Sequence, residues 1–106
     1  MKDFRQEIFT KVKTHLLTQN KKCVDDKGNS RLRSQGNQCA ASCLIPEKDY
    51  SEKMEPCHFW NFFRESGYSR KELELIQELV SIHDSHNPIT WKNQLKDLAE
   101  NEGLNF

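Results

Sequence analysis

This 106-residue sequence has no long hydrophobic run and few glycines and prolines, four and three respectively. It also has no net charge, because 16 Lys and Arg balance 16 Asp and Glu. No segment approaches the ~18 apolar residues that a membrane-spanning helix needs, and the first residues lack the apolar core of a signal peptide. We therefore expect a soluble protein that stays in a reducing cytoplasm, where cysteines are thiols or metal ligands. The balanced charge excludes a general affinity for nucleic acid that is driven by net positive charge, and the isolated glycines exclude a phosphate-binding glycine loop.

Aromatic residues are well represented: six Phe, two Trp and two Tyr supply bulky material for a core. A chain of this length buries about 60–70% of its unfolded surface, which is enough for one small core without staples. We expect residues 1–106 to form a single compact domain.

Hydrophobic periodicity predicts four helices. The first covers residues 3–19, where Phe4, Ile8, Val12 and Leu16 recur every four residues, with Asp3 as its N-cap and Asn20 at its exit. An aromatic helix follows over 57–63 and stops at Gly67. A capping box at residues 69–72 then opens a helix that ends at residues 84–87. The last helix begins at residues 87–88 and closes at residue 103.

Turn-forming residues separate the first helix from the others. Two turns, over 26–29 and 34–37, flank a short predicted strand at 31–33, and a second strand is expected over 39–45, before Pro46. This arrangement favours a small antiparallel hairpin or ribbon, although the small residues of 39–43 are also compatible with the start of a helix. The fold class is therefore α+β: an N-terminal amphipathic helix, a small sheet and about three packed helices.

Cysteines provide the candidates for metal binding. Cys39 and Cys43 are spaced as one pair of zinc ligands, and Cys57 with His58 is the candidate for the second pair. Adjacent residues point apart in a regular element, so Cys23 or His15 is an alternative ligand. The interpretation we favour is that the cysteines are buried free thiols that pack as small apolar side chains.

Two further patterns contain residue types suited to catalysis. Cys39 could act as a nucleophile if His58, or His83 with Asp84, lay beside it, but no local motif of a cysteine protease is present. The cluster of His83, Asp84 and His86 could hold a metal or transfer protons. We favour a structural role, in which His83 interacts with the last carbonyls of its helix.

Binding surfaces are suggested by charge and by the aromatic stretch. Residues 1–45 hold nine Lys and Arg against four Asp and Glu, so the other residues hold seven against twelve. The cations could form a basic patch for a phosphate-bearing or acidic partner, although no aromatic residue interleaves them to stack on nucleic acid, and ordinary solvated faces are the favoured alternative. The patch would consist of Lys21, Lys22, Lys27, Arg31 and Arg33. In the aromatic stretch, core packing is favoured, and the alternative is that Phe62 and Trp60 are exposed as anchors of a protein–protein interface.

The segment Gln38–Tyr50, followed by Met54 and Glu55, resembles a family of small bacteriophage and prophage proteins with the motif C-A-x-G-C-L-I-P-[DE]-x-x-Y-x-x-x-M-E-G. The helix end at 15–19 and the segment 75–84 are similar as well. Ser42 stands where the family has glycine, and residues 56–58 replace the glycine after Met-Glu. The resemblance implies a phage-encoded accessory protein of the host cytoplasm, and no activity comes with it.

Together, these patterns favour a small phage protein that binds a host protein, such as a defence or regulatory factor, and inhibits it without catalysis of its own. Two alternatives stay open. One is a zinc-stabilised adaptor that uses Cys39 and Cys43 and binds nucleic acid or protein. The other is a thiol-dependent enzyme centred on Cys39. No membrane partner is expected, and the sequence leaves the oligomeric state open.

Overall fold

The computed structural model describes residues 4–29, 31–34, 36–54, 59–85 and 87–106. The helices are α1 (Arg5–Gln19), α2 (Trp60–Glu65), α3 (Arg70–Ser85) and α4 (Trp91–Glu102), and a two-stranded antiparallel sheet consists of β1 (Arg33–Ser34) and β2 (Asn37–Gln38). Short 3₁₀ turns fill the connections: η1 (Ser42–Leu44), η2 (Glu47–Asp49), η3 (Glu52–Met54) and η4 (Pro88–Thr90). The predicted α+β class, with its N-terminal helix, small sheet and following helices, is confirmed.

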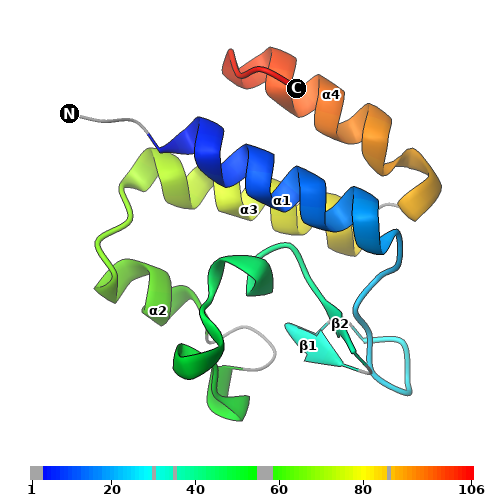
Figure 1. The fold of residues 1–106 in the computed structure, drawn as a ribbon, viewed down its shortest axis with the longest axis vertical. Coiled ribbons are helices and arrows are strands. Elements are labelled where there is room, and N and C mark those ends of the chain that lie inside the picture. Colours follow the sequence, from blue (N-terminus) through cyan, green and yellow to red (C-terminus); the bar gives the residue numbers. More distant parts are fainter. Residues whose placement is uncertain (1–3, 30, 35, 55–58, 86) are drawn as a thin grey trace.

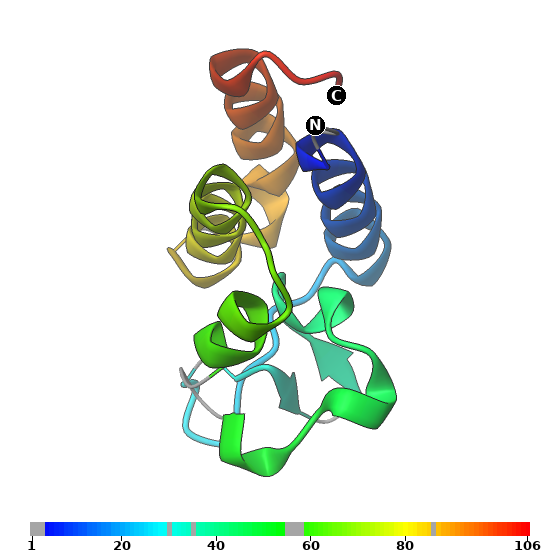
Figure 2. The same ribbon diagram turned by 90° about the vertical axis from the view of Figure 1, so that its left-hand side faces the viewer.

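Two layers make up the molecule. Helices α1, α3 and α4 pack together in the upper half of Figure 2, and the hairpin, the turns η1 to η3 and α2 lie below them. Most of the apolar stripe predicted for α1 belongs to the core, because Ile8, Phe9, Val12 and Leu16 are buried. The facing helices contribute the largest buried side chains, among them Trp91, Leu75, Leu79 and Leu95.

Local capping signals fix the helix ends. Ser69 and Glu72 form the predicted capping box: the Ser69 N–H donates to Oε1 of Glu72 at 2.7 Å, and the Glu72 N–H donates to Oγ of Ser69 at 3.2 Å. Asn20 ends α1 in the left-handed conformation with φ 51°. Gly103 ends α4 with φ 68°, and the following Leu104 N–H donates to the Ala99 carbonyl at 2.8 Å, as a Schellman motif requires. The N-cap position of α1 is Phe4, which makes no side-chain cap, and not the predicted Asp3, which lies outside the described residues.

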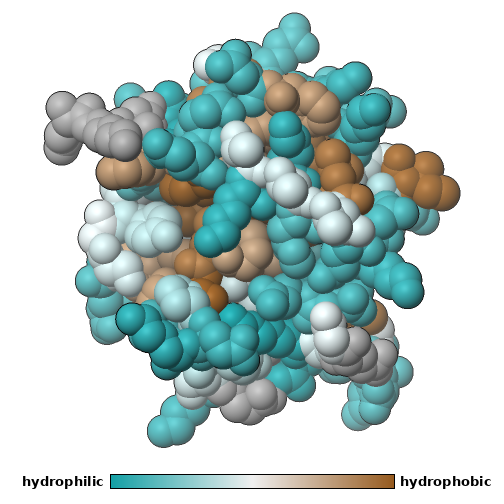
Figure 3. All heavy atoms as spheres, in the orientation of Figure 1, coloured by the Kyte–Doolittle hydropathy of each residue, from teal (hydrophilic) through white to brown (hydrophobic). Residues whose placement is uncertain are grey.

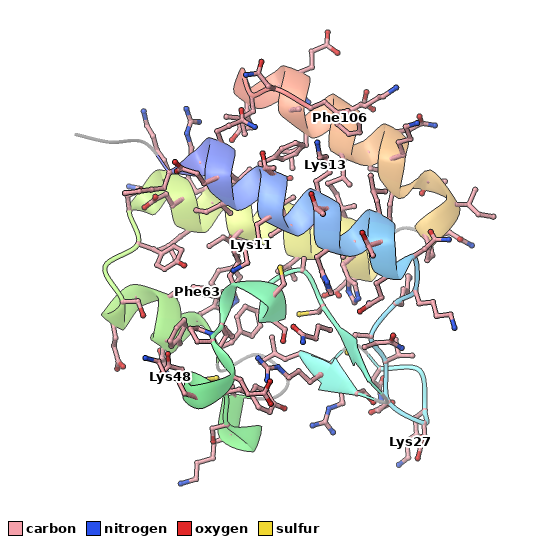
Figure 4. All side chains as sticks on the ribbon, viewed as in Figure 1. Lys11, Lys13, Lys27, Lys48, Phe63 and Phe106 are labelled. Atoms are coloured by element: carbon pink, nitrogen blue, oxygen red, sulfur yellow. The ribbon has the colours of Figure 1, made fainter. Side chains whose placement is uncertain are left out.

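The C-terminal segment folds back along α4 after that helix ends (Figure 1), and it contacts α1, where the rings of Phe9 and Phe106 meet edge-on with centroids 6.5 Å apart. The side chain of Gln6 hydrogen-bonds both the carbonyl and the N–H of Asn105, at 2.9 and 2.8 Å. The Nζ atom of Lys13 lies 4.7 Å from the centre of the Phe106 ring (Figure 4). These contacts join the segment after α4 to the outer side of α1.

The strand predicted over 39–45 is wrong. Hydrogen bonding from the hairpin ends where the Cys39 N–H donates to the Leu32 carbonyl at 2.9 Å, and the chain then turns into η1. Ala40, Ala41 and Ser42 are buried in succession. A half-buried strand would alternate buried and exposed positions, so three consecutive buried residues are incompatible with it. The strand predicted at 31–33 is shifted to 33–34.

None of the helices in the described ranges combines the length and the apolar character that crossing a membrane requires.

Candidate functional site

An apolar groove lies between α1 and the loop that joins α2 to α3, and we call it the α1 groove. Its volume is about 380 Å³. On the face seen in Figure 3, hydrophobic side chains gather between α1 and α2. The apolar lining of the groove comes from Phe4, Ile8, Leu44 and Tyr68.

Three segments build this groove. Phe4 is the N-cap residue of α1, and Ile8 and Lys11 follow it at helical spacing, so the three lie on one side of the helix. Leu44 comes from η1. The Tyr68 ring packs edge-on against Phe63 with ring centroids 5.1 Å apart, and Phe63 is fully buried. On the core side, the wall of the groove therefore packs against a fully buried ring, whereas Phe4 at its edge is 47% exposed.

Charged groups line the groove beside its apolar surface. Glu7 and Lys11 are exposed on α1, and Figure 4 shows Lys11 pointing from α1 toward η1. The carboxylate of Glu72 is held by the capping box, so its position is fixed. Burial raises the pKa of the Tyr68 hydroxyl, and the nearby charge of Glu72 raises it further. Tyr68 is therefore a neutral hydrogen-bonding group at neutral pH.

The predicted anchor Trp60 lines a second groove, between α2 and α3, with a volume of about 520 Å³. Trp60 is half-buried, and its ring lies 4.7 Å from that of Phe59. Phe62, the other predicted anchor, is also half-buried and lies 5.4 Å from Phe63 between ring centroids. Both aromatic side chains pack on the core and keep part of their surface exposed. We call this second site the α2–α3 groove.

The predicted basic patch is only partly present. Lys21 and Lys27 are exposed, and Lys22 donates from Nζ to the Asp84 carbonyl at 3.2 Å. Arg31 is half-buried, and its backbone N–H donates to the Cys23 carbonyl at 3.0 Å. Two exposed lysines are thus left from the five cations of the predicted patch.

Arg33 differs most from the prediction, because its guanidinium is hydrogen-bonded to residues 42 and 45 of the same chain and does not extend into solvent. Its Nε donates to Oγ of Ser42 and its Nη2 to the Ile45 carbonyl, each at 2.9 Å. The guanidinium lies 4.3 Å from the centre of the Tyr50 ring, and the side chain is 17% exposed. Arg33 therefore holds η1 against the hairpin and is not a surface cation.

The cysteine thiols lie inside the protein. Cys23 and Cys39 are buried and Cys43 is half-buried, and all three are thiols that form no disulfide. Burial raises the pKa of the Cys39 thiol to about 12 and that of Cys43 to about 11. At neutral pH both groups are therefore protonated, which is the wrong state for a nucleophile.

Metal-binding geometry is absent from the part of the chain that the structure describes, where no three His, Cys, Asp or Glu side chains gather as ligands would. The Nε2 atom of His15 donates instead to the Gln38 carbonyl at 2.9 Å. Cys57 and His58, the predicted second pair, lie outside the described residues.

The prediction that His83 interacts with the last carbonyls of its helix is wrong, because the side chain points into the core. Its Nε2 accepts a hydrogen bond from the Cys23 N–H at 2.9 Å, and its Nδ1 lies 2.6 Å from Oδ1 of Asp84. The ring stacks on Trp91 with centroids 5.6 Å apart. His83 is fully buried, so this arrangement is part of the core. His86, the third member of the predicted cluster, lies outside the described residues.

Sequence reasoning missed the α1 groove. The apolar spacing assigned Phe4 to the core. Periodicity does not reveal how far the segments that pack over α1 extend, so it could not show that Phe4 is left partly exposed. Tyr68 follows the helix-ending Gly67, a position that signals a loop and no function. Lys11 also lines the groove, but in the sequence it is an ordinary cation on the first helix and nothing distinguishes it from the other lysines. No protein-family profile, curated protein or solved structure matches this chain.

Proposed function

We propose that this chain is a small phage-encoded accessory protein that binds a host protein in the host cytoplasm through the α1 groove, and so inhibits a defence or regulatory factor. The proposal includes no catalysis by the chain itself. The observation that carries it is the apolar groove whose edge is a large aromatic side chain, Phe4, with 47% of its surface exposed.

The size and lining of the groove suit one large apolar side chain of a partner. Pockets that bind ligands range from about 300 to 1,000 Å³, and the α1 groove lies near the lower limit. Aromatic residues that become fully buried when the partners bind contribute most to protein–protein binding, often about 2 kcal/mol or more each. Phe4 and Tyr68 are the residues of this type here. Glu7 and Lys11 add opposite charges that select the orientation of the partner.

The state of the thiols favours binding over the enzymatic alternative. A thiol nucleophile needs a lowered pKa and solvent access, and Cys39 has a raised pKa and a buried side chain. Binding requires only the exposed apolar surface that the α1 groove supplies.

A pull-down with paired variants tests the proposal. Phe4→Asp places a charge at the edge of the α1 groove, and Ile89→Asp makes the same change at an apolar side chain that is 87% exposed and does not line this groove. Tagged wild type and both variants are incubated with bacterial host lysate, and the bound proteins are quantified by mass spectrometry. Circular dichroism confirms that each variant is folded.

The expected result is a host protein that wild type and Ile89→Asp recover equally and that Phe4→Asp recovers at least about tenfold less, as the loss of one aromatic anchor implies. Equal recovery by all three proteins would assign binding to another surface. Recovery of no host protein above background would contradict the proposal itself.

A further inference from the structure

The exposed side of α3 has a regular order of side chains. Arg70, Gln77 and Asp84 are seven residues apart, which is close to two helical turns, so they align along one side of the 16-residue helix. Leu73 and Val80 lie beside this line on the side that forms the α2–α3 groove with Trp60. We call Arg70, Leu73, Gln77, Val80 and Asp84 the α3 stripe.

The ends of the α3 stripe carry opposite charges. Arg70 is 93% exposed at the start of the helix and lies 3.4 Å from Glu74. The side chain of Asp84, at the end of the helix, is 37% exposed. Between them, Leu73 and Val80 are half-buried and Gln77 is exposed. The stripe therefore runs from a cation, which Glu74 partly neutralises, through the half-buried Leu73 and Val80 and the exposed Gln77 to an anion.

This order of charges makes the α3 stripe complementary to the same stripe of a second copy that runs in the opposite direction. In two helices that pack antiparallel around a two-fold axis at Gln77, Arg70 of one copy faces Asp84 of the other, and the same contact occurs a second time. The apolar middle of each stripe then covers that of the other. A partner of the same charge order in the parallel direction would bring like charges together.

We propose that the α2–α3 groove binds a second copy of this chain, with the two α3 helices antiparallel and Gln77 at the two-fold axis. Trp60, Leu73 and Val80 of each copy are covered in this dimer. Because the contact involves few apolar side chains, the dimer is weak and forms at high local concentration. Glu72, which α3 contributes to the α1 groove, lies on another side of the helix, so this inference is independent of host-protein binding.

Disulfide trapping tests the position of the axis. In Gln77→Cys, two introduced thiols meet at the axis and form an intermolecular disulfide under mild oxidation. Lys71→Cys is the matched control, because Lys71 is also exposed on α3 but does not line the groove. We expect Gln77→Cys to form the cross-linked dimer at least about tenfold faster than Lys71→Cys. Equal rates would overturn the proposal, even if the wild-type chain dimerised by another surface.

Charge reversal tests the antiparallel direction. Arg70→Glu places a carboxylate beside Asp84 of the second copy at both contacts, and Asp84→Lys places an ammonium group beside Arg70, so each variant repels itself. In an equimolar mixture, the introduced carboxylate of one variant meets the introduced ammonium group of the other, and the unchanged Asp84 meets the unchanged Arg70. We expect sedimentation analysis to show each variant alone about tenfold weaker in dimerisation than wild type, and the mixture restored to wild-type affinity.

Folding of these variants is checked by circular dichroism, because Asp84 also interacts with His83. If Asp84→Lys does not fold, Asp84→Asn replaces it. Introduced alone, Asp84→Asn is expected to weaken dimerisation, because Arg70 of the second copy loses its anion. Added to Arg70→Glu, it is expected to strengthen dimerisation, because it removes the repulsion between the two carboxylates. A wild-type chain that stays monomeric at millimolar concentration would overturn the proposal, as would a mixture no stronger than its separate components.

Discussion

The backbone N–H of Cys23 donates a 2.9 Å hydrogen bond to Nε2 of His83, which lies 60 residues further along the chain. Because Nε2 accepts this bond, the proton of the neutral imidazole is on Nδ1, from which it is donated to Oδ1 of Asp84 at 2.6 Å. The ring also stacks on Trp91, at the start of α4. A single buried side chain thus connects the segment before the hairpin to α3 and α4.

Replacing His83 with leucine should destabilise the protein more than a change of volume alone would. The Cys23 N–H would be left buried without its acceptor, at a cost of about 1–3 kcal/mol. Urea unfolding followed by tryptophan fluorescence measures the loss. Asp84→Asn is the control, because its amide oxygen can still accept from Nδ1, and a smaller loss is expected. A leucine variant as stable as wild type would show that the bond contributes nothing.

The guanidinium of Arg33 is predicted to be needed for the position of η1. Arg33→Lys keeps the charge but cannot reproduce the geometry that reaches Ser42 and the Ile45 carbonyl together. We expect the free energy of unfolding to fall by about 1–3 kcal/mol in this variant. Lys21→Ala, at an exposed cation, should change it by less than about 0.5 kcal/mol. Equal stability of the two variants would place Arg33 among the surface cations.

Stability should fall at alkaline pH because the pKa of the Cys39 thiol is raised from 9.0 to about 12 in the folded protein. The folded state holds this proton more tightly than the unfolded state, so the stabilisation is complete below pH 9 and is lost as the pH rises toward 12. Cys43, raised to about 11, has the same sign.

Urea unfolding of wild type and Cys39→Ala across this pH window isolates the effect of the thiol. Other groups titrate in the same range, so the difference in slope between the two proteins is the quantity of interest. The wild type should lose stability more steeply above pH 9. Parallel curves would mean that the thiol is not protected from ionisation in the folded protein.

Thiol alkylation at neutral pH gives a separate prediction. Iodoacetamide should modify Cys39 much more slowly than free cysteine, because the reactive thiolate is scarce and buried. Cys43, which is half-buried, should react faster than Cys39. Peptide mapping by mass spectrometry gives both rates. Rapid and selective modification of Cys39 would instead support the thiol-enzyme hypothesis.

Local rules predicted the parts of the fold that depend on neighbours in sequence. The capping box of Ser69 and Glu72 and the buried stripe through Val12 follow from spacings of three or four residues. The exit of α1 at Asn20 follows from residue type, because asparagine tolerates the left-handed conformation. These features need no knowledge of the rest of the molecule, and the structure confirms them.

Contacts between distant segments explain what could not be predicted. The Gln19 side chain bonds both the N–H and the carbonyl of Gln38, at 2.8 and 2.9 Å, and so binds the hairpin to α1. Arg33 similarly draws Ser42 and Ile45 inward and replaces the expected strand by a turn. The α1 groove has the same origin, because the exposure of Phe4 depends on where η1 and the α2–α3 loop end.

The central claim is that the α1 groove binds a host protein, and photo-cross-linking in host cells tests it most directly. A benzophenone amino acid is placed at Ser66, which is exposed and lines the groove, and in a second variant at Asn93, which is exposed on α4. Our account predicts that Ser66 cross-links to a host protein, that Asn93 does not, and that adding Phe4→Asp abolishes the product. Cross-linking to the same protein from both positions, or from neither, would contradict it.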